Sequence, residues 1–162
     1  EPVSLDEVLQ QALRGIPDED VCDETDESLP LLLTDSGLLE RAVANLVENA
    51  VHHSPANTRV RVCAAVVPDG SLQLRIIDQG PGVDEADRDR MFQPFQRLGD
   101  APDGAGVGLG LAVARGLSTA VGATLEAEDT PGGGLTMVVS IPLSPVDKFG
   151  DTSATDRSGG VA

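Results

Sequence analysis

The order of the predicted secondary-structure elements constrains the fold of this 162-residue sequence more than any other feature. Two pairs of strand segments, 59–67 with 72–77 and 124–129 with 135–141, are each joined by a short turn rich in Pro and Gly, which is the pattern of a β-hairpin. A helical segment precedes each hairpin. Helices that alternate with antiparallel hairpins favour a two-layer α/β sandwich over a doubly wound parallel sheet.

The first two helices have recognisable starts and ends. Ser4–Glu7 has the sequence of a capping box and opens a helix that reaches about Leu13. Asp35 is the expected N-cap of the longest helix, Leu38 to about His52, which ends before Ser54. The apolar residues of this helix that fall on one arc at helical spacing are Leu39, Ala42, Val43, Leu46 and Ala50.

Shorter elements complete the domain. We predict helices over 83–91 and 108–121 and an edge strand around Val21. From Ser144 onward the residues are polar and small. We therefore expect one domain over residues 1–143 and a disordered tail over residues 144–162.

The charge of the chain excludes whole classes of partner. Acidic residues outnumber basic ones 27 to 11, for a formal charge of −16. This field repels phosphate backbones and anionic lipid, so we expect no nucleic-acid partner and no direct membrane contact. Cys22 and Cys63 lie far apart without metal-ligand spacing, which favours reduced thiols. No signal peptide is visible, and a start at Glu1 without Met is typical of a piece of a longer protein.

Two polar clusters border apolar elements. Asn45 and Asn49 are four residues apart and so project from one helix face, with His52 a turn further on. Amide oxygens can ligate a hard cation such as Mg²⁺, although two asparagines can also form a solvated stripe. Asp78 ends an apolar strand and precedes Gly80 and Gly82. This is either an ordinary turn or a carboxylate that accepts a hydrogen bond from an exocyclic amine such as that of adenine.

Two further clusters lie between Met91 and Leu111. The glycines that precede the helix starting near Gly108 expose backbone N–H groups beside a positive helix terminus, which is an anion site. The polar loop 99–105 before them excludes a Rossmann site, and the single lysine, Lys148, excludes a Walker loop. The segment Met91–Arg97 is a hydrophobic plug that ends in a cation able to reach phosphates.

In order and spacing, these four segments resemble the ATP-binding catalytic domain of bacterial sensor histidine kinases, within the group that includes gyrase B, the Hsp90 chaperones and MutL. The resemblance covers residues 2–143 and implies the Bergerat ATP-binding fold, a mixed, mostly antiparallel sheet covered by helices on one face. The Leu29-Pro30 and Asn45–Pro55 segments also resemble the potassium-sensing kinases. The boxes of the family are matched by Asn45–Ser54 (N box), Asp78–Gly82 (G1 box), Met91–Arg97 (F box) and Gly106–Leu111 (G2 box).

The resemblance implies ATP and Mg²⁺ as cofactors and assigns a role to each matching residue. Asn49 would ligate the Mg²⁺, and Asn45 would act beside the phosphates as a catalytic residue. Asp78 would accept a hydrogen bond from the adenine amino group. Arg97 would act on the phosphate side, within a segment 95–106 that covers the nucleotide. The other implied nucleotide-binding residues are His52, His53, Gly80, Gly82, Val83, Gly106, Val107, Gly108, Leu109 and Gly110.

One departure from the family concerns the end of the N box. The family usually has Lys then Tyr where this chain has His52 and His53. Because a neutral imidazole is a weaker phosphate partner than an ammonium, we expect nucleotide affinity to be low or pH-dependent.

The resemblance also implies partners. The family transfers the γ-phosphoryl group to a histidine on a separate dimerisation and phosphoacceptor hairpin, and the two histidines of this chain lie inside the N box. We therefore expect a histidine-kinase catalytic domain that is monomeric, does not autophosphorylate alone, and works with that hairpin and a response regulator. The expected location is cytoplasmic, as the cytosolic domain of a membrane-anchored kinase.

Other functions remain open at this point. A stand-alone serine kinase of the same fold, of the anti-sigma-factor type, needs no hairpin, and a degenerate domain would bind partner proteins without nucleotide. A hydrolysing ATPase like gyrase is disfavoured, because those enzymes have a Glu where Asn45 stands and an amide cannot take the proton from water.

Overall fold

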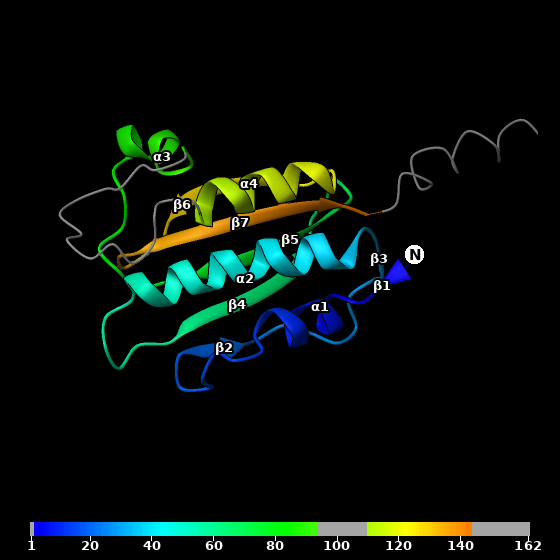
Figure 1. Cartoon of the computed structure of the whole chain (residues 1–162), viewed down its shortest axis with the longest axis horizontal. Helices are drawn as coiled ribbons and strands as arrows, with labels where there is room; N and C mark the ends of the chain where they lie inside the picture. Colours follow the sequence, from blue (N-terminus) through cyan, green and yellow to red (C-terminus); the bar gives the residue numbers. More distant parts are fainter. Residues whose placement is uncertain (1, 94–109, 144–162) are drawn as a thin grey trace, which may run out of the picture.

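The computed structural model describes residues 2–93 and 110–143, which form two layers (Figure 1). One layer is a five-stranded sheet of order β2-β4-β5-β7-β6, and the other contains α1, α2 and α4. The helices are α1 (Leu5–Ala12), α2 (Ser36–His53), α3 (Glu85–Met91) and α4 (Gly110–Ala120). The strands are β1 (Pro2–Val3), β2 (Val21–Asp23), β3 (Leu32–Leu33), β4 (Val60–Val66), β5 (Ser71–Ile77), β6 (Thr124–Asp129) and β7 (Leu135–Pro142).

The sheet confirms the two predicted hairpins and the mixed topology. β4 pairs with β5 and β6 pairs with β7, each antiparallel, and β5 joins the two hairpins by pairing antiparallel with β7. β2 pairs parallel with β4 at one edge of the described sheet, as expected for the strand around Val21. The two-layer α/β sandwich predicted from the order of elements is thus the observed fold.

The core lies between the sheet and the helices. Along β5 the residues alternate between buried and half-buried, so that Leu72, Leu74 and Ile76 face the helices with no exposed surface. This period of two is what a strand needs to cover one face. The apolar arc of α2 is buried as predicted, with Val47 added to it. Burial of these two faces against each other is the main driving force that holds the layers together.

Helix ends follow the predicted caps. The Ser4 hydroxyl accepts a hydrogen bond from the Glu7 N–H at 3.1 Å, and the Asp35 carboxylate accepts one from the Leu38 N–H at 3.1 Å. Each cap satisfies an N–H that the first turn of a helix leaves without a partner. α2 ends at His53 because Ser54 is extended, as a residue before proline tends to be.

Some features differ from the sequence-based expectations. The two-stranded sheet of β1 and β3 has no predicted counterpart, because two residues per strand are too few to show a period. The predicted helix 83–91 begins at Glu85, since Asp84 has extended backbone. Residues 108 and 109 and the predicted tail lie outside the described residues.

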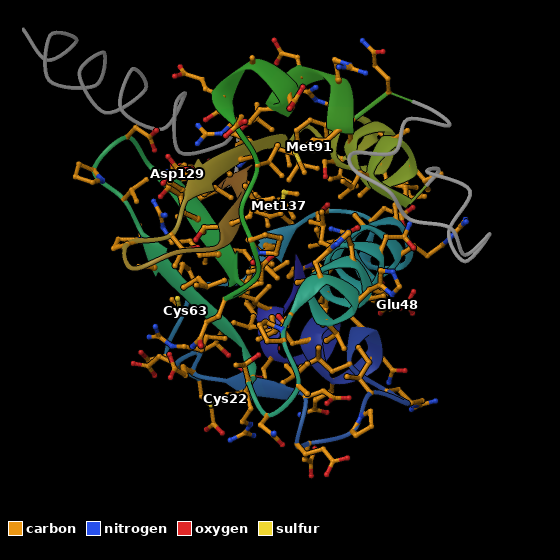
Figure 2. The ribbon with its side chains drawn as sticks, turned by 90° about the vertical axis from the view of Figure 1, so that its left-hand side faces the viewer. Cys22, Glu48, Cys63, Met91, Asp129 and Met137 are labelled. Carbon is orange, nitrogen blue, oxygen red and sulfur yellow. The ribbon has the colours of Figure 1, made fainter. Side chains whose placement is uncertain are left out.

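The remaining expectations concern thiols and membrane. Cys22 on β2 and Cys63 on β4 are free and half-buried, as expected (Figure 2). None of the described helices is long and apolar enough to cross a membrane.

Candidate nucleotide-binding site

The Asp78 carboxylate is the most constrained polar group of the site. It follows the last residue of β5 and is 4% exposed. Its Oδ1 accepts hydrogen bonds from the N–H groups of Gly80 and Leu135, both at 2.9 Å. These bonds hold the carboxylate rigidly and satisfy one oxygen. No hydrogen bond to Oδ2 is recorded in the described part of the chain, so this oxygen is the one left for a ligand.

Glycines allow three distant segments to meet at Asp78. A Cβ on Gly80 would lie 2.5 Å from the His53 carbonyl oxygen, so the end of α2 lies directly against the turn that follows β5. A Cβ on Gly134 would overlap the Asp78 carbonyl oxygen. Gly82 adopts φ +76°, a conformation that side chains other than glycine rarely adopt. The predicted N box and G1 box therefore meet, and the turn between β6 and β7 closes on the G1 box.

The end of α2 borders this junction, and the polar face of the helix carries the predicted asparagines. Asn45 and Asn49 are half-buried, next to the buried arc of the helix, as the spacing predicted. His52 and His53 are exposed and their rings meet edge to face, with centroids 5.2 Å apart. The helix thus presents amides along its length and imidazoles at its end.

The two histidines have different surroundings. Partial desolvation lowers the pKa of His53, the proximity of His52 lowers it further, and the Asp78 carboxylate acts in the opposite direction. The net effect keeps the His53 ring neutral to a lower pH than usual. His52 instead lines a cavity of about 400 Å³ between α2 and the loop that follows α1. The other residues of this cavity are Arg14, Gly15, Ile16, Pro17, Asp20, Glu48 and Val51.

The F-box segment is described as far as Gln93. Met91 and Phe92 are 6% and 7% exposed and belong to the core, which confirms the predicted hydrophobic plug for its first two residues. Figure 2 shows Met91 below α3, on the side that faces the interior. The rest of the plug, Arg97 and the predicted site residues Gly106, Val107, Gly108 and Leu109 lie outside the described residues.

Sequence reasoning missed the contribution of β7 to the site. The Leu135 N–H donates to the Asp78 carboxylate, and the Leu135 carbonyl accepts from the Asp78 N–H at 3.0 Å. The run Gly132–Gly134 predicted only a turn. Three consecutive glycines are more than a turn needs, and this excess was the available signal that backbone approaches closely there.

Family comparison agrees with this geometry. Residues 34–145 match the family model described as histidine kinase-, DNA gyrase B-, and HSP90-like ATPase. The chain belongs to this family, as the ATP-binding catalytic domain of a two-component sensor histidine kinase.

Relatives place the chain more finely within the family. It is 41% identical over 160 residues to the sensor protein KdpD of Rathayibacter rathayi, a match that covers 98% of this chain and 18% of the relative. The chain thus spans about a fifth of that protein. The mycobacterial sensor histidine kinase MprB has a similar structure, with TM-score 0.75 and 29% identity over 90% of this chain and 98% of that one. The ATP-binding domain of PrrB from Mycobacterium tuberculosis gives TM-score 0.66 and 28% identity, over 88% and 96% of the two chains.

The described residues fit a bound adenine nucleotide. An adenine amino group needs a fixed acceptor, and the Asp78 carboxylate is held in place by two backbone N–H groups. The half-buried amide oxygens of Asn45 and Asn49 are hard donors of the kind that Mg²⁺ takes together with phosphate oxygens.

Proposed function

We propose that this domain binds Mg-ATP at the Asp78 junction and presents the γ-phosphate to a histidine on the dimerisation and phosphoacceptor hairpin of a KdpD-type sensor kinase. The observation that carries the proposal is the buried Asp78 carboxylate, which is oriented by two backbone N–H groups and has a second oxygen left for a ligand. Such an arrangement favours a ligand that donates a hydrogen bond, such as an exocyclic amine, because a buried carboxylate oxygen without a donor is costly.

In this proposal the chain's own residues bind and orient the nucleotide. Asp78 accepts the adenine amine, and Gly80, Gly82 and Val83 form the wall beside the ring. Asn49 holds Mg²⁺, which neutralises charge on the phosphates, and Asn45 lies beside the phosphates and orients the reacting group. Phosphoryl transfer depends mainly on positioning and electrostatic stabilisation, so these contacts are the catalysis that the domain contributes.

The remaining site residues have proposed roles on the phosphate side. Gly106, Val107, Gly108, Leu109 and Gly110 would let backbone N–H groups at the start of α4 bind the β- and γ-phosphates. Arg97 would add a planar cation there. The last two proposed nucleotide-binding residues are His53 and His52. His53 adjoins the Asp78 turn through its backbone, and His52 lines the neighbouring cavity.

The partners follow from the family, in which this domain is one part of a longer kinase. The proposed substrate is the hairpin histidine, and the proposed recipient of the phosphoryl group is a response regulator. The similarity to KdpD over almost the full chain favours this function over a stand-alone serine kinase. The oriented Asp78 carboxylate favours it over a degenerate domain that binds no nucleotide.

Transfer in trans tests the proposal. The domain is mixed with the parent kinase's isolated hairpin and with γ-labelled ATP, with and without Mg²⁺, and acid-labile phosphate on the hairpin is measured. We expect Mg²⁺-dependent labelling that Asn49→Ala abolishes, while Gln11→Ala, an exposed amide on α1, leaves it unchanged. Acid-stable phosphate on a serine, or equal labelling by Asn49→Ala, would contradict the proposal.

A further inference from the structure

α3 is a short helix that stands at the edge of the two layers (Figure 1). It has seven residues, of which only Met91 is buried. A helix this short has little stability of its own, so tertiary contacts must hold it in place. The position of α3 therefore depends on the contacts that its side chains make with the rest of the domain.

Two arginines attach this helix to the body of the domain. Arg88 of α3 forms an ion pair with Asp129 at the end of β6, Nη2 to Oδ1 at 2.5 Å. Arg115 of α4 lies over the ring of Phe92, the residue that follows α3, with its guanidinium carbon 4.4 Å from the ring centroid. A cation at this distance from a ring face is attracted by the ring's quadrupole.

Arg115 lies in the middle of α4. It is the sixth of the eleven residues of α4, five residues after Gly110. Helical side chains lean toward the N-terminus, so its guanidinium reaches back along the first turns of α4. There it covers Phe92, which is only 7% exposed, while Arg115 itself stays exposed. The contact therefore joins the C-terminal end of α3 to the middle of α4.

We infer that Arg115 is a positioning residue that holds the α3 end against the middle of α4 and so fixes this helix, whose start is the proposed phosphate-binding end. The inference rests on the proposed function for the identity of the ligand. Because the contact fixes α4 and involves no residue next to Asp78, its loss weakens binding of the triphosphate and leaves the adenine end, held by Asp78, unchanged.

Four variants and one control separate the effect of the Arg115–Phe92 contact from the effect of the Arg115 charge alone. Arg115→Met keeps the apolar length of the side chain and removes the cation, and Phe92→Leu keeps an apolar side chain and removes the ring. The double variant completes a cycle, Arg115→Lys retains a cation, and Arg41→Met, an exposed arginine on α2, is the control.

The first readout uses the ligand-free protein. In denaturant unfolding, each variant raises the unfolding equilibrium constant by some factor. We expect the factor for the double variant to be about two- to fivefold smaller than the product of the factors for the two single variants, because both single variants lose the same contact. Amide hydrogen exchange in α3 should be faster in Arg115→Met than in Arg115→Lys or Arg41→Met. Multiplicative single effects, or unchanged α3 exchange, would overturn the inference.

The second readout compares nucleotides by calorimetric titration. We expect Arg115→Met and Phe92→Leu each to lower affinity for a non-hydrolysable Mg-ATP analogue about two- to fivefold, with no further loss in the double variant and no change for AMP. An effect of Arg115→Met without one of Phe92→Leu would mean that the charge acts on phosphate directly, and would overturn the positioning role. Wild-type protein that binds no nucleotide would contradict the proposed function, and the ligand-free readout would still decide whether Arg115 holds α3.

Discussion

Replacement of Asp78 by Asn is the most informative single change. The side chain keeps its size, and its amide oxygen can still accept from the Gly80 and Leu135 N–H groups, which now lie 2.9 Å from Oδ1. The amide NH₂ then takes the place of Oδ2 and points a donor at the adenine amine. A donor–donor contact replaces a charge-assisted hydrogen bond.

The magnitude of the effect on binding follows from that exchange. A hydrogen bond to a charged group contributes about 1.5–3 kcal/mol, so the affinity for Mg-ADP should fall about 10- to 150-fold. Fold stability should change less. The two backbone N–H groups keep a neutral acceptor, and the cost of burying a charge disappears.

Calorimetric titration of Mg-ADP measures this change, with Asp69→Asn as the control. Asp69 makes a similar local turn, because its Oδ1 accepts from the N–H two residues on, that of Ser71, at 2.9 Å, but it is exposed in the turn between β4 and β5. We expect Asp69→Asn to bind like the wild type. Equal affinity of Asp78→Asn and wild type, with both proteins folded, would refute the assignment of Asp78 to the adenine.

Three further predictions concern stability. Gly134→Ala forces a Cβ onto the Asp78 carbonyl oxygen at φ +113° and should lower the free energy of unfolding by about 2–5 kcal/mol, measured in denaturant. Gly132→Ala, at φ +92° in open space, should lower it by about 1–2 kcal/mol. Equal losses would contradict the close approach of Gly134 to Asp78. Asp35→Ala removes the α2 N-cap and should lower stability by about 1 kcal/mol, and a change below the error of the unfolding measurement would speak against the cap. Since the pKa of His53 is lowered on folding, the unfolded chain binds more protons below about pH 6.5, so the contribution of this residue to stability is complete above that pH and declines as the pH falls. His53→Gln should therefore reduce the loss of unfolding free energy as the pH falls below about 6.5. An unchanged dependence of stability on pH would contradict the assignment of this loss to His53.

Much of the site could be predicted because its residues lie in local patterns. Asp78 follows an apolar strand and precedes two glycines, and the asparagines of α2 repeat at helical spacing, so single segments carry enough information. The contact of Gly134 with Asp78 joins positions that no local pattern relates. The Arg115–Phe92 contact and the β1–β3 pair likewise depend on how elements pack in three dimensions, which periodicity does not encode.

Saturable binding of Mg-ADP to the wild-type domain tests the central claim most directly. Without tryptophan the chain has no intrinsic tryptophan fluorescence, so heat is the practical signal. We predict one site per chain and competition by the ATP analogue. No heat of binding at millimolar nucleotide, both at pH 6 and at pH 8, would contradict the account of this protein as a nucleotide-binding kinase domain.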